Sequence, residues 1–213
     1  MQGLFSEMAA GIDDGAFEKA LEVHGKRVAG CDEAGRGPLA GPVVAACVIL
    51  PVNDHRVSCF VDSKTLSPPR REQLYRQLLD LRATIGIGIV SAATIDRINI
   101  LQASLLAMLR AVKALPGPPP DFLLIDGTFT IACDIDQRAM VKGERKSRAI
   151  AAASIVAKVE RDRLMTELHH TYPLYNFAAH KGYPTAAHRQ ALRTHGPCPA
   201  HRLTFNGVRE HAR

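Results

Sequence analysis

The sequence predicts an α/β protein built around a mixed β-sheet. Short runs of Val, Ile and Leu alternate with longer segments of helical spacing, which is the pattern of strands and helices packed in layers. Aromatic residues make up only 5% of the chain and Trp is absent, so aliphatic side chains must fill the core. A length of 213 residues suits one sizeable domain with a small appendage.

The N-terminal part predicts two strands and a helix. Residues 1–25 suggest an accessory helix or a loose tail. Residues 28–31 form a short apolar strand that a glycine-rich stretch ends, and residues 43–50 form a second strand rich in β-branched side chains. Residues 68–81 have helical spacing, and Ser67 stands before two prolines as a candidate N-cap.

The middle of the chain predicts a strand, a long helix and another strand. Residues 83–90 form the third strand, and residues 91–115 form a helix that a proline-rich segment ends. The stripe expected to face the sheet consists of Leu101, Leu105, Met108, Leu109 and Val112. Residues 122–125 then form a buried strand that ends at Asp126.

The last third predicts one short strand and two helices. The strand lies around residues 140–142. Residues 146–169 form a long helix, and its segment 151–157 has unusually small side chains, which permits close packing against a sheet. A short helix at residues 186–194 lies in a C-terminal part rich in Pro, Gly and His.

The formal net charge of +6 is unevenly distributed. Residues 1–137 contain 13 Lys and Arg against 16 Asp and Glu, whereas residues 138–213 contain 14 against 5. This asymmetry suggests an acidic site in the first part and a polyanion-binding face in the second. The alternative is a basic surface that only keeps the protein soluble.

The cysteines and the apolar runs predict a cytoplasmic protein. The five cysteines are odd in number and contain no CxxC pair, which favours a reducing compartment. The N-terminal residues lack the pattern of a secretory signal. The longest apolar run, residues 43–50, is too short to cross a bilayer, so we expect no membrane insertion.

Carboxylates follow two of the predicted strands directly. Asp32 and Glu33 stand between an apolar strand and a Gly-Arg-Gly segment, and Asp126 ends a later strand in the same way. Strand ends gather at one edge of an open sheet, so these side chains meet if their strands are neighbours. Glu144, at the end of the last predicted strand, would add a fourth carboxylate.

Two interpretations of these carboxylates are open. Hard oxygen ligands without His or Cys suit Mg²⁺ or Mn²⁺, so the group predicts a metal site. The alternative is that each Asp caps a turn, which is a common role of Asp after a strand.

A series of segments, in the same order, resembles the type 2 ribonucleases H over residues 27–208. The segments are 28–43 with its DEAGRGPLAGP core, 62–67 (DSKTLS), 124–127 (LIDG), 141–144 (VKGE), 151–162, 180–185 (HKGYPT) and 195–202 (HGPCPAHR). The resemblance implies a ribonuclease H-like fold, with a central mixed β-sheet flanked by helices and a helical C-terminal portion.

The resemblance also implies a domain organisation. Residues 1–25 would be an N-terminal extension, and residues 26–170 the ribonuclease H-like catalytic domain. Residues 171–213 would be a C-terminal substrate-binding portion packed on the same domain. The protein is expected to act as a monomer.

The activity implied is that of an endoribonuclease in DNA replication and repair. It would hydrolyse the RNA strand of RNA–DNA hybrids and incise 5′ of single ribonucleotides embedded in duplex DNA. Asp32, Glu33, Asp126 and Glu144 would be both catalytic and metal-binding. Catalysis with two Mg²⁺ or Mn²⁺ ions would give 5′-phosphate and 3′-hydroxyl ends.

Glu144 departs from the family pattern, which has Asp at this position. The extra methylene displaces the carboxylate by about one C–C bond, and such a displacement can cost about 10²-fold in rate. We therefore expect reduced activity or a shifted metal preference.

Two segments resemble the family's means of recognising ribose. Gly35-Arg36-Gly37 resembles the ribose-reading loop, where glycine lets the backbone approach the sugar. Tyr183 resembles the tyrosine that packs on the sugar next to the ribonucleotide; the alternative is an ordinary half-buried Tyr. Gly86 and Gly88, inside a predicted strand, are interpreted as packing positions.

Several further polar residues have open roles. The candidate phosphate contacts are Lys64, Lys142, Arg145, Lys146 and Lys181, each of which could equally be a solvated surface charge. Asp162 lies four residues after Lys158 on a helix, which favours an ion pair over catalysis. The histidines at 180, 188, 195 and 201 could bind zinc with Cys198, but their spacing fits no familiar zinc pattern.

Two rival functions are weighed against this one. The first is a binder of RNA–DNA hybrids that does not cut, because Glu144 has spoiled the metal site. The second is another ribonuclease H-like nuclease, such as a junction resolvase or a transposase core, and the GRG and HKGY segments argue against it. No motif for docking on a replication clamp is evident, since residues 203–205 are too slight for one.

Overall fold

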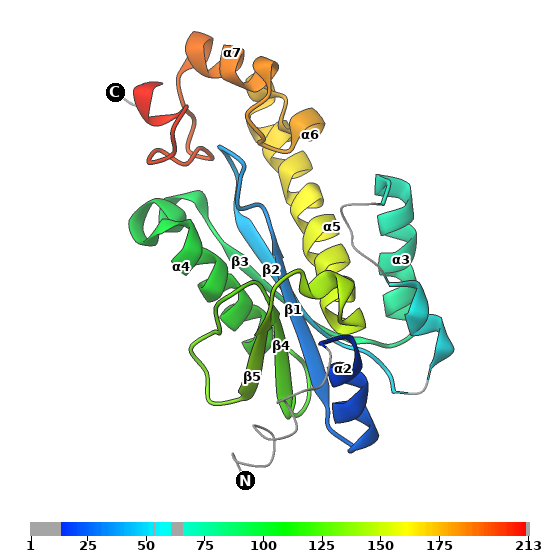
Figure 1. Cartoon of the computed structure of the whole chain (residues 1–213). Helices are drawn as coiled ribbons and strands as arrows, with labels where there is room; N and C mark the ends of the chain where they lie inside the picture. The colour runs from blue at the N-terminus through cyan, green and yellow to red at the C-terminus, as the bar shows by residue number, and fades with distance from the viewer. Residues whose placement is uncertain (1–13, 53, 61–65, 212–213) are drawn as a thin grey trace.

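The computed structural model describes residues 14–52, 54–60 and 66–211. One mixed sheet with strand order β3-β2-β1-β4-β5 forms its centre (Figure 1). The strands are β1 (Val28–Ala34), β2 (Val43–Ile49), β3 (Thr84–Val90), β4 (Phe122–Asp126) and β5 (Asp136–Met140). The pairs β1–β2 and β2–β3 are antiparallel, whereas β1–β4 and β4–β5 are parallel. The mixed α/β sheet predicted from the sequence is confirmed.

The pairing of β1 with β4 brings two predicted strand ends together. Cys31 lies opposite Ile125 in the parallel register. The next residues along the two strands, Asp32 and Asp126, therefore lie at the same level on neighbouring strands. The condition that the sequence left open, that these strands be neighbours, is met.

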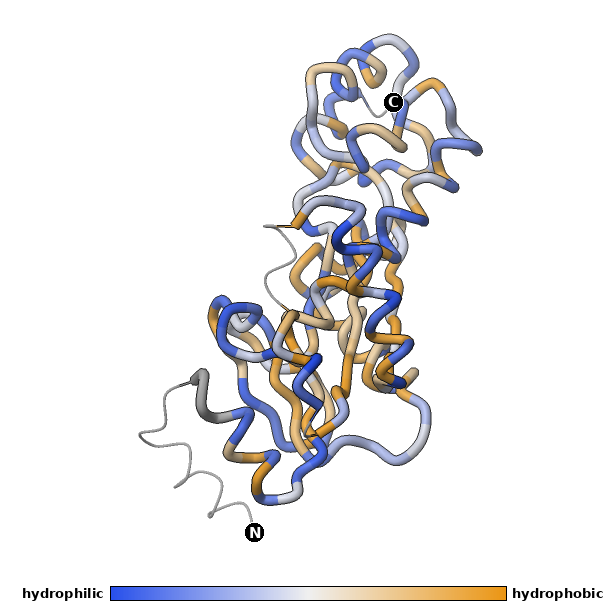
Figure 2. Tube along the Cα trace, turned by 90° about the vertical axis from the view of Figure 1, so that its right-hand side faces the viewer, coloured by the Kyte–Doolittle hydropathy of each residue, from blue (hydrophilic) through white to orange (hydrophobic). Residues whose placement is uncertain are grey.

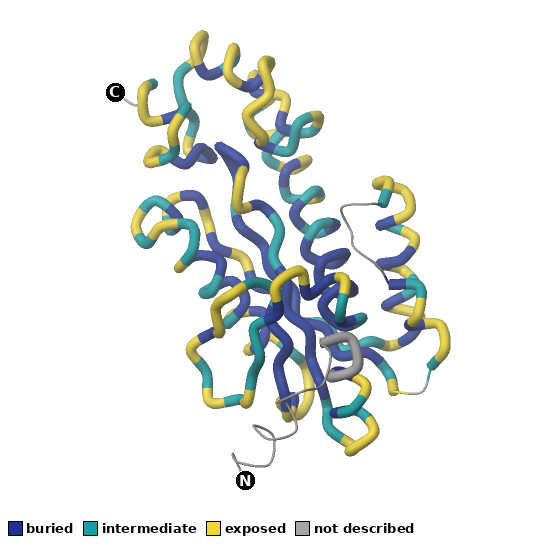
Figure 3. The backbone as a smooth tube through the Cα atoms, viewed as in Figure 1, coloured by how far each residue is buried: buried dark blue, intermediate teal, exposed yellow. Residues whose placement is uncertain are grey.

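Helices cover both faces of the sheet. Helix α4 (Ala92–Lys113) packs on one face, and α5 (Arg148–Thr171) with α3 (Pro68–Asp80) packs on the other (Figure 1). All seven residues of β2 are buried, and the burial colouring shows the central strands enclosed between the helical layers (Figure 3). Burial on both faces explains why β2 has a continuous apolar sequence instead of an alternating one.

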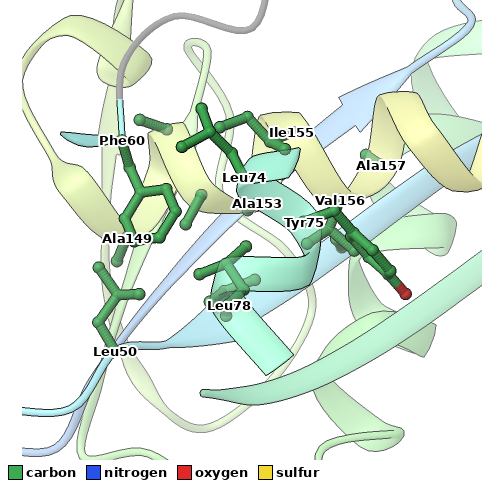
Figure 4. Packing of buried hydrophobic residues seen from close by; sticks show 14 of the residues in the cluster. Leu50, Phe60, Leu74, Tyr75, Leu78, Ala149, Ala153, Ile155, Val156 and Ala157 are labelled. Carbon is green, nitrogen blue, oxygen red and sulfur yellow. The ribbon is translucent and has the colours of Figure 1, made fainter. Parts of the chain in front are cut away.

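The layer formed by α3 and α5 rests on small side chains. Leu74 and Leu78 of α3 pack toward Ala153 and Val156 of α5 (Figure 4). Helix α5 also approaches β1 so closely that a Cβ at Gly30 would lie 2.2 Å from the backbone of Ala149. The close packing predicted for the small-sided part of this helix is confirmed.

The buried face of α4 differs from the predicted stripe. Met108 and Val112 are buried as expected, but Ala103 and Ala107 also face the sheet, and the three predicted leucines are only half-buried. The reason lies in β3, where a Cβ at Gly88 would stand 2.0 Å from the Ala107 carbonyl oxygen. The backbones of helix and strand touch here, so only small residues fit between them. Gly86 makes a similar close approach to α4, so the interpretation of both glycines as packing positions is confirmed.

Two predicted strand positions are wrong. Strand β1 continues to Ala34, so Asp32 and Glu33 lie inside the strand and not after it. The last strand is β5, and residues 141 and 142 follow it. Strand β5 lies at the sheet edge and begins with polar residues, so a search for apolar runs misses it. Glu144 consequently lies in a single 3₁₀ turn, η3 (Gly143–Arg145), instead of at a strand end.

The N-terminal segment contributes a helix, α2 (Asp14–Val23), which agrees with the predicted accessory helix; residues 1–13 lie outside the described residues. Glu18 on α2 is buried, and its carboxylate accepts hydrogen bonds from the backbone N–H groups of Arg148 (2.8 Å) and Ala149 (3.0 Å). These N–H groups begin α5 and have no partner within the helix, so a carboxylate there caps it and suits its dipole.

The C-terminal part extends beyond the end of the sheet (Figure 1). Its elements are η4 (Pro173–Tyr175), α6 (Phe177–His180), α7 (Ala186–His195) and η5 (Arg209–His211). Hydrophobic positions concentrate in the sheet and the helices around it, and the C-terminal part is more hydrophilic (Figure 2). Ala40 forms an isolated antiparallel bridge with His201, which joins this part to the loop after β1. Among the described helices, none combines the length and the hydrophobicity that crossing a bilayer requires.

Candidate active site

A cavity of about 480 Å³ lies where β1 and β4 end. Its lining consists of Asp32, Glu33, Ala34, Gly35, Arg36, Gly37, Arg71, Asp126, Ser154, Lys158 and Tyr183. A larger hollow of about 810 Å³ lies at the C-terminal end, but Glu210 is its one carboxylate among the described lining residues. The smaller cavity is therefore the candidate active site, because it collects the carboxylates.

Asp32 is the most enclosed of these carboxylates, with only 3% of its surface exposed. The Ser154 hydroxyl and the backbone N–H of Glu33 (2.6 Å) both donate to it. Burial raises the pKa of Asp32 well above its usual value, and the negative charges of Glu33 and Asp126 raise it further. The structure thus holds mutually repelling carboxylates in one enclosed place.

Asp126 is fixed by the turn that carries Glu144. Its Oδ1 accepts a hydrogen bond of 2.8 Å from the N–H of Gly143. The turn packs closely at this point, since a Cβ at Gly143 would lie 2.6 Å from Ile150 Cδ1 and 3.3 Å from Asp126 Oδ1. Glu144 is the next residue and is buried, with 7% of its surface exposed, but it is not part of the cavity lining. Of the four predicted carboxylates, the structure brings three to one cavity and places the fourth beside it.

Glu33 and Arg36 connect the carboxylates to the Gly-Arg-Gly loop. Arg36 Nη1 lies 3.3 Å from Glu33 Oε1. Burial raises the pKa of Glu33 and the charge of Asp126 adds to this, while the nearby Arg36 guanidinium acts in the opposite direction. Arg36 is the lining cation that contacts these carboxylates, whereas Arg71 and Lys158, which also line the cavity, pair with Asp162.

The donor set fits a hard divalent cation. Within residues 14–52, 54–60 and 66–211, no three His, Cys, Asp or Glu side chains are already arranged closely enough to hold a metal. The cavity nevertheless concentrates carboxylate oxygens whose mutual repulsion raises the pKa of Asp32. A bound cation would relieve that repulsion, and oxygen ligands favour Mg²⁺ or Mn²⁺ over softer metals.

Tyr183 faces the Gly-Arg-Gly loop across the same cavity. The side chain is 44% exposed, and a Cβ at Gly37 would lie 3.9 Å from Tyr183 Cε1. Tyr183 follows α6 and comes from the C-terminal part, 146 residues after Gly37 in the chain (183 − 37). The fold thus brings together the two segments that were predicted to recognise ribose.

Three polar lining residues were not among the predicted site residues. Ser154 is the one polar side chain in the small-sided run of α5, and that exception is a signal in the sequence. Lys158 forms the predicted ion pair with Asp162, at 2.5 Å, and also lines the cavity. Arg71 comes from α3, with Nη2 4.0 Å from Asp162 Oδ2. No spacing in the sequence points to Arg71, because its position depends on how α3 packs against α5.

Of the predicted phosphate-binding lysines, the three that the structure describes lie outside the cavity lining. Lys142 is exposed and has a left-handed backbone conformation just before η3, and Lys146 follows that turn. Lys181 Nζ donates to the Asp162 carbonyl (3.3 Å) and to Thr166 Oγ1 (3.1 Å). Lys64 lies outside the described residues.

Three histidines, His180, His188 and His201, lie close to the Tyr183 segment. Their hydrogen-bond partners determine which ring nitrogen of each carries the proton. His188 Nδ1 must donate to the Tyr183 carbonyl (2.9 Å), so its Nε2 accepts. His201 Nε2, 3.0 Å away, therefore donates to it, and His201 Nδ1 accepts from the N–H of Cys198 (3.0 Å). His180 Nε2 likewise donates to a carbonyl, that of Tyr175, at 2.7 Å. All three rings are neutral in this network, which supports the backbone on both sides of Tyr183.

This network predicts a loss of stability in mild acid. Burial lowers the pKa of His201 to about 4, with His188 adding to the shift. The unfolded chain takes up a proton near pH 6.5 and the folded chain only near pH 4, so stability is complete above pH 6.5 and falls between these values. We expect a loss of about 1–3 kcal/mol between pH 7.5 and 4.5.

Urea unfolding at several pH values measures this effect. In the His201→Asn variant the dependence on pH should be flatter than in the wild type. Equal slopes in the two proteins would show that His201 does not cause the acid sensitivity.

The fold and the carboxylate-lined cavity together define a ribonuclease H-type hydrolase. The chain superposes on the ribonuclease H2 of Pyrococcus horikoshii with a TM-score of 0.73 and 28% identity, covering 86% of this chain and 96% of that one. A Bst-RNase HIII solved in complex with Mn²⁺ is similar in fold, with a TM-score of 0.71 and 17% identity, covering 87% of this chain and 69% of that one.

Sequence comparison identifies the family within this class. The family model for ribonuclease HII matches residues 29–208. The ribonuclease HII of Geobacter metallireducens is 53% identical over 196 residues, covering 92% of this chain and 91% of that protein. That of Desulfotalea psychrophila is 54% identical over 187 residues, covering 86% and 82%. The chain belongs to the ribonuclease HII family and is a metal-dependent ribonuclease H.

Proposed function

We propose that this protein hydrolyses the RNA strand of RNA–DNA hybrids and incises 5′ of single ribonucleotides embedded in duplex DNA. One observation carries the proposal: carboxylates, the Gly-Arg-Gly loop and Tyr183 line a single cavity. The carboxylates supply the site for cleavage, the Tyr183 ring supplies a contact to the neighbouring sugar, and the loop supplies contacts to the ribose itself. RNA differs from DNA at that sugar by the 2′-hydroxyl, so recognition and cleavage must occur in the same place.

Asp32, Glu33, Asp126 and Glu144 are the proposed catalytic and metal-binding residues, with Mg²⁺ or Mn²⁺ as the cofactor. Two cations held by these residues would supply a lowered pKa for the attacking water and stabilisation of the leaving 3′ oxygen, which would give 5′-phosphate and 3′-hydroxyl ends. The chain itself orients the ligands: Ser154 and the N–H of Glu33 hold Asp32, and the N–H of Gly143 holds Asp126.

Substrate recognition is divided between sugar and phosphate. Gly35, Arg36 and Gly37 present backbone groups to the ribose, and Tyr183 packs on the neighbouring sugar. Lys158 and Arg71 bring positive charge into the cavity beside the cleaved phosphate. The proposed contacts of Lys142, Lys146 and Lys181 would then be to phosphates farther along the duplex, and Lys64 is likewise proposed to contact phosphate; such contacts position the substrate without reading its sequence.

The proposed setting is a cytoplasmic monomer that acts in DNA replication and repair. All five cysteines are free, including Cys31 and Cys47, whose Sγ atoms lie 3.0 Å apart on neighbouring strands. The odd number of cysteines and the lack of a CxxC pair favour a reducing compartment. Residues 26–170 are proposed as the catalytic domain, residues 171–213 as the substrate-binding portion and residues 1–25 as an extension.

Cleavage of a DNA duplex that contains one ribonucleotide tests the proposal. We expect a cut on the 5′ side of the ribonucleotide with Mg²⁺ or Mn²⁺, and none in an Asp126→Asn variant. Product ends analysed by mass should be 5′-phosphate and 3′-hydroxyl. A 2′,3′-cyclic phosphate would contradict the mechanism, and binding without cleavage in either metal would favour the non-catalytic binder of hybrids.

The Glu144→Asp variant should change the metal preference. Mg²⁺ demands near-ideal octahedral geometry and Mn²⁺ is more permissive, so the longer Glu side chain should restrict Mg²⁺ more. We expect the ratio of the Mg²⁺-supported to the Mn²⁺-supported rate to rise about 10-fold in Glu144→Asp. Glu144→Gln, the control, should lower both rates. If the ratio of the two rates is unchanged in Glu144→Asp, Glu144 does not contribute to the metal site.

A further inference from the structure

Two fully enclosed arginines lie beneath the loop that faces the active-site cavity. Arg161 on α5 is 1% exposed, and Arg202 in the C-terminal part is 0% exposed. The hydrogen bonds shown for both guanidinium groups go to backbone carbonyl oxygens. Arginine is rarely buried so completely, and it then usually pairs with a carboxylate.

Arg202 holds both ends of the loop of residues 35–42, which begins with the Gly-Arg-Gly segment. Its Nη2 donates to the carbonyl of Gly35 (2.6 Å) and its Nη1 to that of Arg36 (2.9 Å). Its Nε and Nη2 donate to the carbonyl of Gly41, at 3.1 and 3.0 Å. One side chain from near the C-terminus thus fixes the path of the loop that leaves β1.

Arg161 joins the same loop to the segment that carries Tyr183. Its Nε donates to Pro42 (3.0 Å) and its Nη2 to Ala40 (3.1 Å), both carbonyl oxygens of the loop. Its Nη1 donates to the carbonyl of Lys181 (3.0 Å), two residues before Tyr183. A single planar guanidinium therefore fixes the distance between the two proposed halves of the ribose site.

The backbone packs around these arginines with no room to spare. Gly35 has a φ of +101°, and a Cβ there would lie 2.0 Å from Arg161 Nε. The N–H of Leu39 donates to the carbonyl of Gly182 (2.8 Å), and a Cβ at Gly182 would lie 2.5 Å from the Ala40 carbonyl oxygen. Gly35 therefore has a structural reason to be glycine, namely the arginine beneath it.

The arrangement is costly, which indicates a specific role. Burial lowers the pKa of Arg161 to about 10 and that of Arg202 to about 9, so both guanidiniums still carry a charge at neutral pH. Buried charges cost free energy even when carbonyl dipoles solvate them, and apolar residues would fill the same volume at less cost. Apolar residues would not, however, fix the carbonyl groups of the loop.

We propose that Arg161 and Arg202 are positioning residues that lock residues 35–42 against residues 181–183 and thereby set the selectivity of the site for ribose. The inference rests on the proposed function of that loop and of Tyr183. A lysine cannot replace either arginine, because its ammonium is a single point and cannot reach carbonyls on several sides as the guanidinium fork does.

Arg202→Lys and Arg161→Lys test the proposal, with Arg163→Lys as the matched control. Arg163 lies on the same helix as Arg161 but is exposed and paired with Glu72 and Glu160. On duplex DNA with one ribonucleotide, kcat/KM should fall about 10–100-fold in either test variant, following the cost of an ångström-scale misplacement. Cleavage of a long RNA–DNA hybrid should fall less, because it offers many ribose sugars for binding. The control should match the wild type on both substrates.

Two measurements separate positioning from a general structural role. Mn²⁺ affinity should change less than about 2-fold, and amide hydrogen exchange over residues 35–42 should accelerate in both test variants. If Arg202→Lys does not fold, Arg161→Lys provides the same measurements. In addition, free guanidinium added to Arg202→Ala should restore part of the lost cleavage. Unchanged exchange, or equal losses on the two substrates, would overturn the inference. If the wild type cuts neither substrate, the proposed function is refuted. The amide hydrogen exchange of residues 35–42 would still test whether Arg161 and Arg202 hold this loop in place.

Discussion

Replacing Asp32 with Asn should abolish cleavage and, without divalent metal, make the protein more stable than the wild type. Asp32 is buried beside Glu33 and Asp126, and burial with their charges raises its pKa. Asn has the same shape and can keep the hydrogen bonds from Ser154 and from the Glu33 N–H, but it carries no charge. We expect the rate to fall at least about 10³-fold, because a ligand oxygen is lost. Relief of repulsion should add about 1 kcal/mol of stability, which raises Tm by about 2–4 °C in a chain of this size.

Thermal unfolding in EDTA and in Mn²⁺ measures both parts of this result. In EDTA the variant should melt above the wild type, and Mn²⁺ should stabilise the wild type more than the variant. Asp162→Asn provides a control of opposite sign, since it removes the partner of Lys158 and should lower stability in either condition. A variant less stable than the wild type in EDTA would show that the cluster is not strained by its own charge.

The hydrophobic pattern was enough to predict the sheet because burial dictates it. Strand β2 is enclosed on both faces and has a continuous run of apolar residues, and β4 is a short apolar run that ends at Asp126. Once such strands are located, parallel pairing of β1 with β4 places Asp32 and Asp126 side by side. Local sequence marks the two strands of this part of the candidate site, and the structure supplies the pairing that the sequence left open.

Other features of the fold and of the candidate site depend on tertiary packing, which cannot be predicted from local sequence. Strand β5 pairs with β4 at an edge of the sheet, so its residues need not be apolar, and the turn with Glu144 was placed wrongly as a result. Arg71 reaches the cavity because α3 packs on α5. Arg161 and Arg202 resemble surface charges in the sequence, and only the fold shows that both are enclosed. For the Glu144 turn and for Arg71 the sequence did not show where the residue lies, and for the two arginines it did not show that they are buried.

The Tyr183→Ala variant should lose cleavage at a single ribonucleotide while keeping its affinity for metal. The ring lies across the cavity from Gly37, but hydrogen bonds of the backbone hold the segment in place, including the bond from His188 to the Tyr183 carbonyl. Truncating the side chain should therefore remove the contact with the sugar and leave the loop unchanged. Aromatic contacts with nucleotides are worth about 1–3 kcal/mol, so we expect kcat/KM to fall about 5–150-fold.

Tyr183→Phe is the matched control, because it keeps the ring and removes only the hydroxyl. If packing on the sugar is what matters, Phe should retain most of the activity, and Mn²⁺ affinity should be the same in the wild type and both variants. Loss of metal affinity in parallel with cleavage would contradict a role in substrate packing. Equal damage by Phe and Ala would move the role from the ring to the hydroxyl. Since Tyr183 lines the cavity together with Asp32 and Asp126, the variants change one wall of a site whose other wall remains intact.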